Sequence, residues 1–182
     1  MSNISFLANY IKPVYVQKRD ENDNLRPYKT AMVEIDKTSH KDRILLDTLS
    51  HNWGVYNYIS DIYYEMEDSL LSGRIFDNKH IFAITSQMSN WDNMRPDDVL
   101  AVAQFAEKND MNELEYIQVN PEHGYVNFNS TFKNIGSAML KFLKETFPEK
   151  HIKVFPAPNA VEFYRKNDFK PYPEEKRAFW DA

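Results

Sequence analysis

Short runs rich in β-branched and aromatic residues alternate with polar clusters along the chain. Such runs, bounded by Gly, Pro, Asn, Asp or Ser, are typical of β-strands. A polar turn at 19–24 separates the first two runs, and 108–110 joins two later runs into a predicted hairpin. The predicted strands are 14–16, 31–35, 80–85, 99–106, 114–119, 151–155 and a last one near Phe169.

Apolar residues at helical spacing predict helices between these strands. Thr38 and Ser39 are candidate N-caps of a first helix, which is expected to end at residues 51–54. Gly73 is a plausible stop for a second helix. A third helix follows Gly136, and a short fourth one starts at Ala160. The second helix is the clearest, with Ile59, Ile62, Tyr63, Met66 and Leu70 on one face and the acids Asp61, Glu65 and Asp68 on another.

The order of these elements predicts an α+β fold with a single mixed, mostly antiparallel central sheet flanked by helices. The length of 182 residues fits one domain over 1–182. Residues 1–26 are expected to form an N-terminal extension that adds a strand or a hairpin.

Composition narrows the function classes. A net charge of −5 argues against a protein held on nucleic acid by phosphate contacts, and it does not exclude a cationic partner such as an amine. The absence of cysteine excludes disulfides, thiolate metal sites and a covalent cysteine intermediate. The five histidines show no ligand spacing, so no metal is expected. No signal peptide or membrane span is visible, and a cytoplasmic location is expected.

The most distinctive passage is a strand that ends in Val119-Asn120-Pro121, followed later by Lys133-Asn134-Ile135-Gly136-Ser137-Ala138 at a helix start. The first N–H groups of a helix have no intrahelical partner, and they carry a partial positive charge that suits a phosphate. Gly136 lets a ligand approach the backbone because it has no Cβ. The alternative is that Gly136 and Ala138 only let the helix pack close to the sheet.

This passage resembles the pyrophosphate motif of the GNAT superfamily of acyl-CoA-dependent N-acetyltransferases. That motif consists of Arg or Gln, any two residues, Gly, any one residue, and then Gly or Ala. A second motif of that family resembles the run from Ala160 through Phe163-Tyr164 to Phe169. The resemblance extends from about Ala31 onward and implies the GNAT-like acyl-CoA N-acyltransferase fold.

The chain departs from the family pattern at several positions. Lys133 replaces Arg or Gln, Asp168 replaces Gly, and 122–132 is longer than the corresponding segment of the family. Asp tolerates a left-handed conformation, so the turn at Asp168 is expected to survive. Asn159 is interpreted first as an N-cap, with Glu162 completing a capping box.

The resemblance also implies roles for individual residues. The strand before the helix should bulge and splay, and pantetheine should pair with its backbone. Tyr164 matches the general acid that protonates the leaving thiolate. Glu115 is the chosen candidate for the base, with Glu113 and Glu107 as alternatives, and strand alternation would place Glu113 and Glu115 on the face opposite Leu114 and Tyr116. The implied acyl-CoA contacts are Ile117, Gln118, Val119, Lys133, Asn134, Ile135, Gly136, Ser137, Ala138 and Asn159.

Acceptor specificity in the family comes from the first two helices and nearby loops, which points to Trp53 and Tyr56, with Trp91 and the acidic helix face beside them. Trp53 can equally be a core residue. The expected function is an acetyl-CoA-dependent N-acetyltransferase that acts directly on a primary amine of a small molecule or peptide. The alternative is a non-catalytic CoA-binding or regulatory module with the same fold. The oligomeric state, including a homodimer, stays open.

Overall fold

A single nine-stranded sheet organises the molecule, in the order β6-β1-β2-β3-β4-β5-β7-β9-β8. The computed structural model describes residues 8–54, 58–73, 78–124, 127 and 129–181. Neighbouring strands are antiparallel except β5 and β7, which run parallel. The predicted mixed, mostly antiparallel sheet is confirmed. The strands are β1 (Asn9–Arg19), β2 (Leu25–Glu34), β3 (Lys79–Thr85), β4 (Val99–Ala106), β5 (Asn112–Val119), β6 (Phe132–Lys133), β7 (Ile152–Val154), β8 (Lys170–Pro171) and β9 (Phe179–Trp180).

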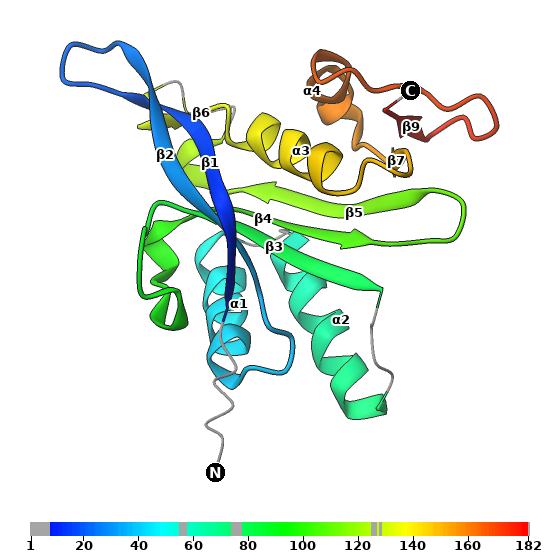
Figure 1. The fold of residues 1–182 in the computed structure, drawn as a ribbon, viewed down its shortest axis with the longest axis horizontal. Helices are drawn as coiled ribbons and strands as arrows, with labels where there is room; N and C mark the ends of the chain where they lie inside the picture. Colours follow the sequence, from blue (N-terminus) through cyan, green and yellow to red (C-terminus); the bar gives the residue numbers. More distant parts are fainter. Residues whose placement is uncertain (1–7, 55–57, 74–77, 125–126, 128, 182) are drawn as a thin grey trace.

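Helices cover both faces of the sheet (Figure 1). The helices α1 (His40–Asn52) and α2 (Tyr58–Ser72) lie on one face, and α3 (Ile135–Thr146) and α4 (Val161–Lys166) lie on the other. Alternation along the strands sends side chains to both layers: Met32 packs in the α3 layer, whereas its neighbours Ala31 and Val33 pack in the α1–α2 layer. No described helix is long and apolar enough to span a bilayer.

The first hairpin is longer than the sequence predicts. β1 spans 11 residues and pairs with β2 on one side, while Gln17 and Lys18 pair with β6 on the other. The outer part of β1 is polar. The hydrophobic pattern therefore detects only the stretch around Val14 and Val16, whose side chains are buried. The strand β1 is therefore an inner strand of the main sheet at this end.

The predicted helix starts and stops are largely reproduced. Ser39 caps α1 by accepting a hydrogen bond from the N–H of Asp42, and Gly73 follows α2 with a φ of 64°. The prediction that Leu70 belongs to the buried face of α2 is wrong, because its side chain is 40% exposed. The buried stripe continues from Met66 to Ser69, a step of three residues rather than four.

Candidate functional site

The strand β5 diverges from its neighbour β7 partway along its length. Only Asn112, Glu113 and Leu114 pair with β7, whereas pairing with β4 continues to Val119. The register with β4 shifts where Phe105 opposes Leu114 and Gln104 opposes Tyr116, which leaves Glu115 as the extra residue of a β-bulge. On the edge away from β4, residues 115–119 have no strand partner in the described part of the chain. The bulge and the splay that the family resemblance implies are both present.

The bulge changes the predicted alternation of side chains along β5. Leu114 lies in the core beneath α3, whereas Tyr116 packs in the layer of α1 and α2. Glu115 also points toward α2, since its carboxylate shares partners with Glu65 of that helix. The prediction that Leu114 and Tyr116 share a face is therefore wrong, because Tyr116 lies on the same side as Glu115. Strict alternation fails because the bulge adds one residue to the strand.

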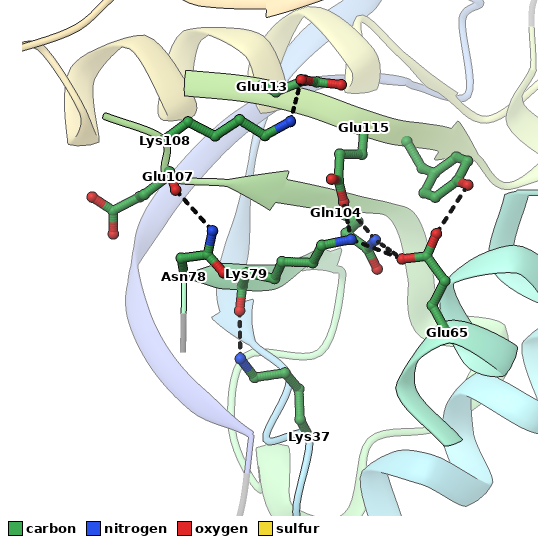
Figure 2. A network of polar contacts seen from close by, with 10 residues as sticks. Lys37, Glu65, Asn78, Lys79, Gln104, Glu107, Lys108, Glu113 and Glu115 are labelled. Atoms are coloured by element: carbon green, nitrogen blue, oxygen red, sulfur yellow. Dashed lines mark hydrogen bonds and ion pairs between the residues drawn. The ribbon is translucent and has the colours of Figure 1, made fainter. Parts of the chain in front are cut away.

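Glu115 lies in a half-buried ionic network that joins α2 to three strands (Figure 2). The ammonium of Lys79 is 2.7 Å from Glu115 Oε2 and 2.9 Å from Glu65 Oε2. The amide of Gln104 donates to the same two oxygens at 2.8 and 2.7 Å. The hydroxyl of Tyr116 donates to Glu65 Oε1 at 3.2 Å.

The contacts within this network favour the charged forms of Lys79 and Glu65. Burial opposes the charge of Lys79, but its bonds to Glu115 and Glu65 outweigh burial and raise the Lys79 pKa. Burial likewise opposes the charge of Glu65, yet Lys79 and Gln104 lower the Glu65 pKa. Burial, with Glu65 nearby, raises the pKa of Tyr116 to about 12. The network thus holds one cation between two anions.

The alternative bases are also paired. Glu113 accepts a hydrogen bond from Lys108. Glu107 lies 2.9 Å from Nε2 of His80, whose Nδ1 lies 2.7 Å from Glu34. Each candidate carboxylate therefore already forms an ion pair, which a bound amine would have to join or displace before proton transfer.

Helix α3 begins beside the splayed strand, and its first backbone donors have no hydrogen-bond partner among the described residues. Its N-cap Asn134 is left-handed, with φ 59°, and its side chain makes no capping hydrogen bond. The first intrahelical bond runs from the N–H of Ala138 to the carbonyl of Asn134. No described residue accepts a hydrogen bond from the N–H groups of Ile135, Gly136 or Ser137. These three donors match the predicted phosphate cradle.

Most side chains around the predicted phosphate cradle contact other parts of the protein. Ile135 is 2% exposed and packs in the core, so its side chain is not available to a ligand. Lys133 donates to the carbonyl of Asn127 at 2.8 Å and pairs through β6 with Gln17. Ser137 and Ala138 are partly exposed. Recognition of an anion at this place would therefore depend on backbone amides.

Gly136 also has a packing role. A Cβ at Gly136 would stand 3.0 Å from Cζ of Phe163 on α4 and 3.6 Å from Cγ2 of Val119 on β5. The absence of a side chain lets α3 approach α4 and β5 closely. The packing interpretation of this glycine therefore holds alongside the backbone donors of the helix start.

Tyr164 lies at the contact between α4 and the sheet. It is 6% exposed and packs edge-on against Phe163 and Phe169 at 5.0 and 5.4 Å. Burial raises its pKa well above the ordinary value, with a smaller contribution from Tyr58. The turn after α4 forms as predicted, although Asp168 replaces the glycine of the family motif, because Asp168 adopts a φ of 65°.

The predicted capping box at Asn159 is wrong. Asn159 is exposed and lies in a 3₁₀ turn, Pro158–Ala160, whose Ala160 N–H bonds to the carbonyl of Ala157. This turn, which Pro158 starts, delays α4 so that Ala160 becomes its N-cap, without a side-chain bond. The side chain of Asn159 contacts neither α3 nor β5 through any hydrogen bond within the described chain.

On the acceptor side, Trp53 is a core residue with 8% exposure, in contact with the layer of α1 and α2. Tyr56 lies outside the described residues. Trp91 stacks on Tyr10 at 4.5 Å.

Sequence reasoning missed Tyr58, the first residue of α2. Its N–H donates to Gln118 Oε1 at 2.6 Å, and its ring lies 5.6 Å from that of Tyr116. The only signal in the sequence was its place at the start of the second helix.

Sequence comparison with protein-family models and with curated proteins finds no match. Solved structures do match. A Desulfovibrio desulfuricans protein assigned to the GNAT family of acetyltransferases aligns with a TM-score of 0.54 and 11% identity, over 83% of this chain and 94% of its own. The PaiA N-acetyltransferase of Thermoplasma acidophilum, in complex with coenzyme A, aligns with a TM-score of 0.50 and 15% identity, over 79% and 93%. At such identities the likeness concerns architecture, and the chain has the fold of the GNAT acetyltransferases.

Proposed function

We propose that this protein is an acetyl-CoA-dependent N-acetyltransferase that transfers the acetyl group directly to a primary amine. One juxtaposition carries the proposal. The unpartnered edge of β5, the amides of Ile135, Gly136 and Ser137, and the phenol-bearing helix α4 meet around Val119 and Gly136. A strand edge suits an extended amide chain, and a helix start suits a pyrophosphate. The PaiA structure, which contains coenzyme A in the same fold, supports this assignment.

In this proposal the backbone of Ile117, Gln118 and Val119 binds the pantetheine arm. The amides of α3 bind the pyrophosphate, with Lys133, Asn134 and Ala138 at the rim. A backbone N–H of β5 also stabilises the oxyanion that forms when the amine attacks the thioester. Direct transfer is favoured because the chain has no cysteine to carry an acyl group.

Tyr164 is assigned to the leaving sulfur. Because burial raises its pKa, complete proton transfer from this phenol to a thiolate of ordinary pKa near 8.5 would be uphill. A hydrogen bond donated to the developing thiolate has no such cost. Tyr164 therefore stabilises the leaving group mainly as a donor. The attacking amine gives its proton to the candidate base, and the released thiolate takes a proton from solvent, so that the products are the amide and the free thiol.

The acceptor is proposed to be a cationic amine. Asp61 and Asp68 are exposed on α2, with Glu65 between them, and Tyr58 and Tyr116 provide aromatic surface at the end nearest Tyr164. Carboxylates raise the local concentration of an ammonium ion, and aromatic faces bind cations. Glu115 is the candidate base, provided that the bound amine competes with Lys79 for its carboxylate.

Calorimetry with acetyl-CoA tests the cofactor assignment. We expect saturable binding of CoA and acetyl-CoA, and no binding of an acetyl thioester of cysteamine, which lacks the pyrophosphate. No heat at millimolar CoA would refute the assignment. Thiol release with a panel of amines then tests turnover. Glu115→Gln should lower turnover, whereas Glu113→Gln is the matched control on the same strand.

A non-catalytic CoA-binding module is the second candidate. The observation that favours it is the pairing of Glu107, Glu113 and Glu115 with His80, Lys108 and Lys79, which leaves each carboxylate occupied. Under this alternative CoA binds with the same affinity, but no amine in the panel releases thiol above the hydrolysis rate.

A further inference from the structure

Gln118 connects the unpartnered edge of β5, which is the proposed place of the pantetheine arm, to helix α2, which carries the proposed amine-binding surface. Its backbone belongs to the unpartnered stretch of β5, where it opposes Val102 of β4 on the other edge. Its side chain reaches α2, where Oε1 accepts a hydrogen bond from the N–H of Tyr58 at 2.6 Å. These residues lie 60 positions apart in the chain.

This bond satisfies a donor that the helix itself cannot. The first N–H groups of a helix need partners outside it, and side-chain oxygens usually supply them from the preceding turn. Here a strand residue supplies the oxygen. A displacement or stiffening of β5 at Gln118 therefore acts directly on the first turn of α2.

A second contact two turns further along holds the same helix to β5. The hydroxyl of Tyr116 donates to Glu65, and the ring of Tyr116 lies against that of Tyr58. Glu65 is also fixed by Lys79 and Gln104, so this contact belongs to a network that does not include Gln118. The two contacts can be removed independently by substitution.

We infer that Gln118 is a positioning residue that couples occupation of the β5 edge to the ordering of the first turn of α2. The inference rests on the proposed function, because it takes the β5 edge as the place of the pantetheine arm. Binding of acetyl-CoA stiffens β5 at Gln118, and the hydrogen bond to Tyr58 transmits this to the helix start. The amine then binds a surface that the first ligand has ordered.

Hydrogen exchange in the full chain, with and without saturating CoA, tests the coupling. In the wild-type protein we expect CoA to slow exchange about tenfold or more in the first turns of both α3 and α2. Gln118→Met keeps the length of the side chain but removes the acceptor. It should retain slowing at α3 and lose most of it at α2.

Two further variants separate coupling from general loosening of α2. Gln118→Glu restores an oxygen acceptor and should restore the slowing at α2. Tyr116→Phe removes the hydroxyl bond to Glu65 but keeps the ring beside Tyr58, and it should leave the slowing at the first turn in place. With an accepted amine, Gln118→Met should raise the KM for the amine at least fivefold and leave the KM for acetyl-CoA within twofold, on the order of the loss of one hydrogen bond.

The outcomes distinguish the coupling from the proposed function. Equal slowing at α2 in wild type and Gln118→Met, with slowing at α3 in both, overturns the coupling and leaves CoA binding intact. Absence of slowing at both helices overturns the cofactor assignment, and the coupling with it.

Discussion

The Cα of Gly136 faces the ring of Phe163 so closely that a Cβ there would stand 3.0 Å from its Cζ. We expect Gly136→Ala to be nearly neutral in stability, because a gain of about 1 kcal/mol in helix propensity offsets a small shift of the partly exposed Phe163 ring. Gly136→Val adds branches that also meet Val119, and it should cost roughly 1–3 kcal/mol in denaturant unfolding.

Adding Phe163→Ala separates the two roles of Gly136. The second substitution opens space, so it should reduce the stability cost of Gly136→Val. If the double variant binds CoA more weakly than the wild type although its stability is restored, the added side chain blocks the amides of α3. If the double variant binds CoA as tightly as the wild type and is as stable, Gly136 matters only for packing. A Gly136→Val single variant as stable as the wild type would contradict the close contact with Phe163.

Features encoded locally were predictable from the sequence. Ser39 as an N-cap, Gly73 after α2 and the left-handed turn at Asp168 depend on a few neighbouring residues and are present. Asn159 shows the limit of such signals, because an Asn followed three residues later by Glu indicates a capping box, yet Pro158 starts a 3₁₀ turn that displaces the helix start. Competing local signals cannot be ranked without the path of the chain.

Features set by contacts distant in sequence were not predictable. The bulge at Glu115 depends on the register of β5 against β4, and it places Tyr116 on the face opposite to the expected one. The bond from Tyr58 to Gln118 joins segments 60 positions apart. The sequence therefore predicted the elements around the candidate site, but not which side chains of β5 point toward α2.

The buried phenol of Tyr164 gives a prediction for turnover. Tyr164→Phe removes a donor from the position assigned to the leaving sulfur, so kcat should fall roughly 10- to 100-fold. The KM for acetyl-CoA should change little, because the remaining ring still packs against Phe169. Steady-state thiol release measures both constants. Tyr172→Phe, which removes a hydroxyl that donates to the nearby Glu174, is the matched control. A Tyr164→Phe variant with full kcat would remove this residue from the mechanism.

Lys79 is predicted to stabilise the fold by separating two carboxylates. Lys79→Met leaves Glu65 and Glu115 facing Gln104 without a cation between them, and we expect a loss of roughly 1–3 kcal/mol. Screening should place the value toward the lower end, because the side chain of Glu65 is 36% exposed. Adding Glu115→Gln removes the repulsion and should recover part of the loss. A Lys79→Met variant as stable as the wild type in urea would contradict this account.

His80 provides a pH-dependent contribution to stability. Its two nitrogens face Glu34 of β2 and Glu107 beyond β4, and its ring lies against Phe82 and Phe147. The bond to Glu34, with a smaller contribution from Glu107, outweighs burial and raises the His80 pKa. Because the folded pKa exceeds the unfolded value of about 6.5, the contribution is fully present below that pH and is lost as pH rises through the folded pKa.

The melting temperature of the wild type minus that of His80→Gln should therefore be largest near pH ~5 to 6 and should decline at higher pH. His51→Gln removes a 75% exposed ring from α1 and is the matched control, with a difference that should stay small throughout. Titration of the His80 ring by NMR would check the raised pKa directly. A wild-type advantage that grows with rising pH would show that neutral His80, rather than its ion pairs with Glu34 and Glu107, stabilises this end of the sheet.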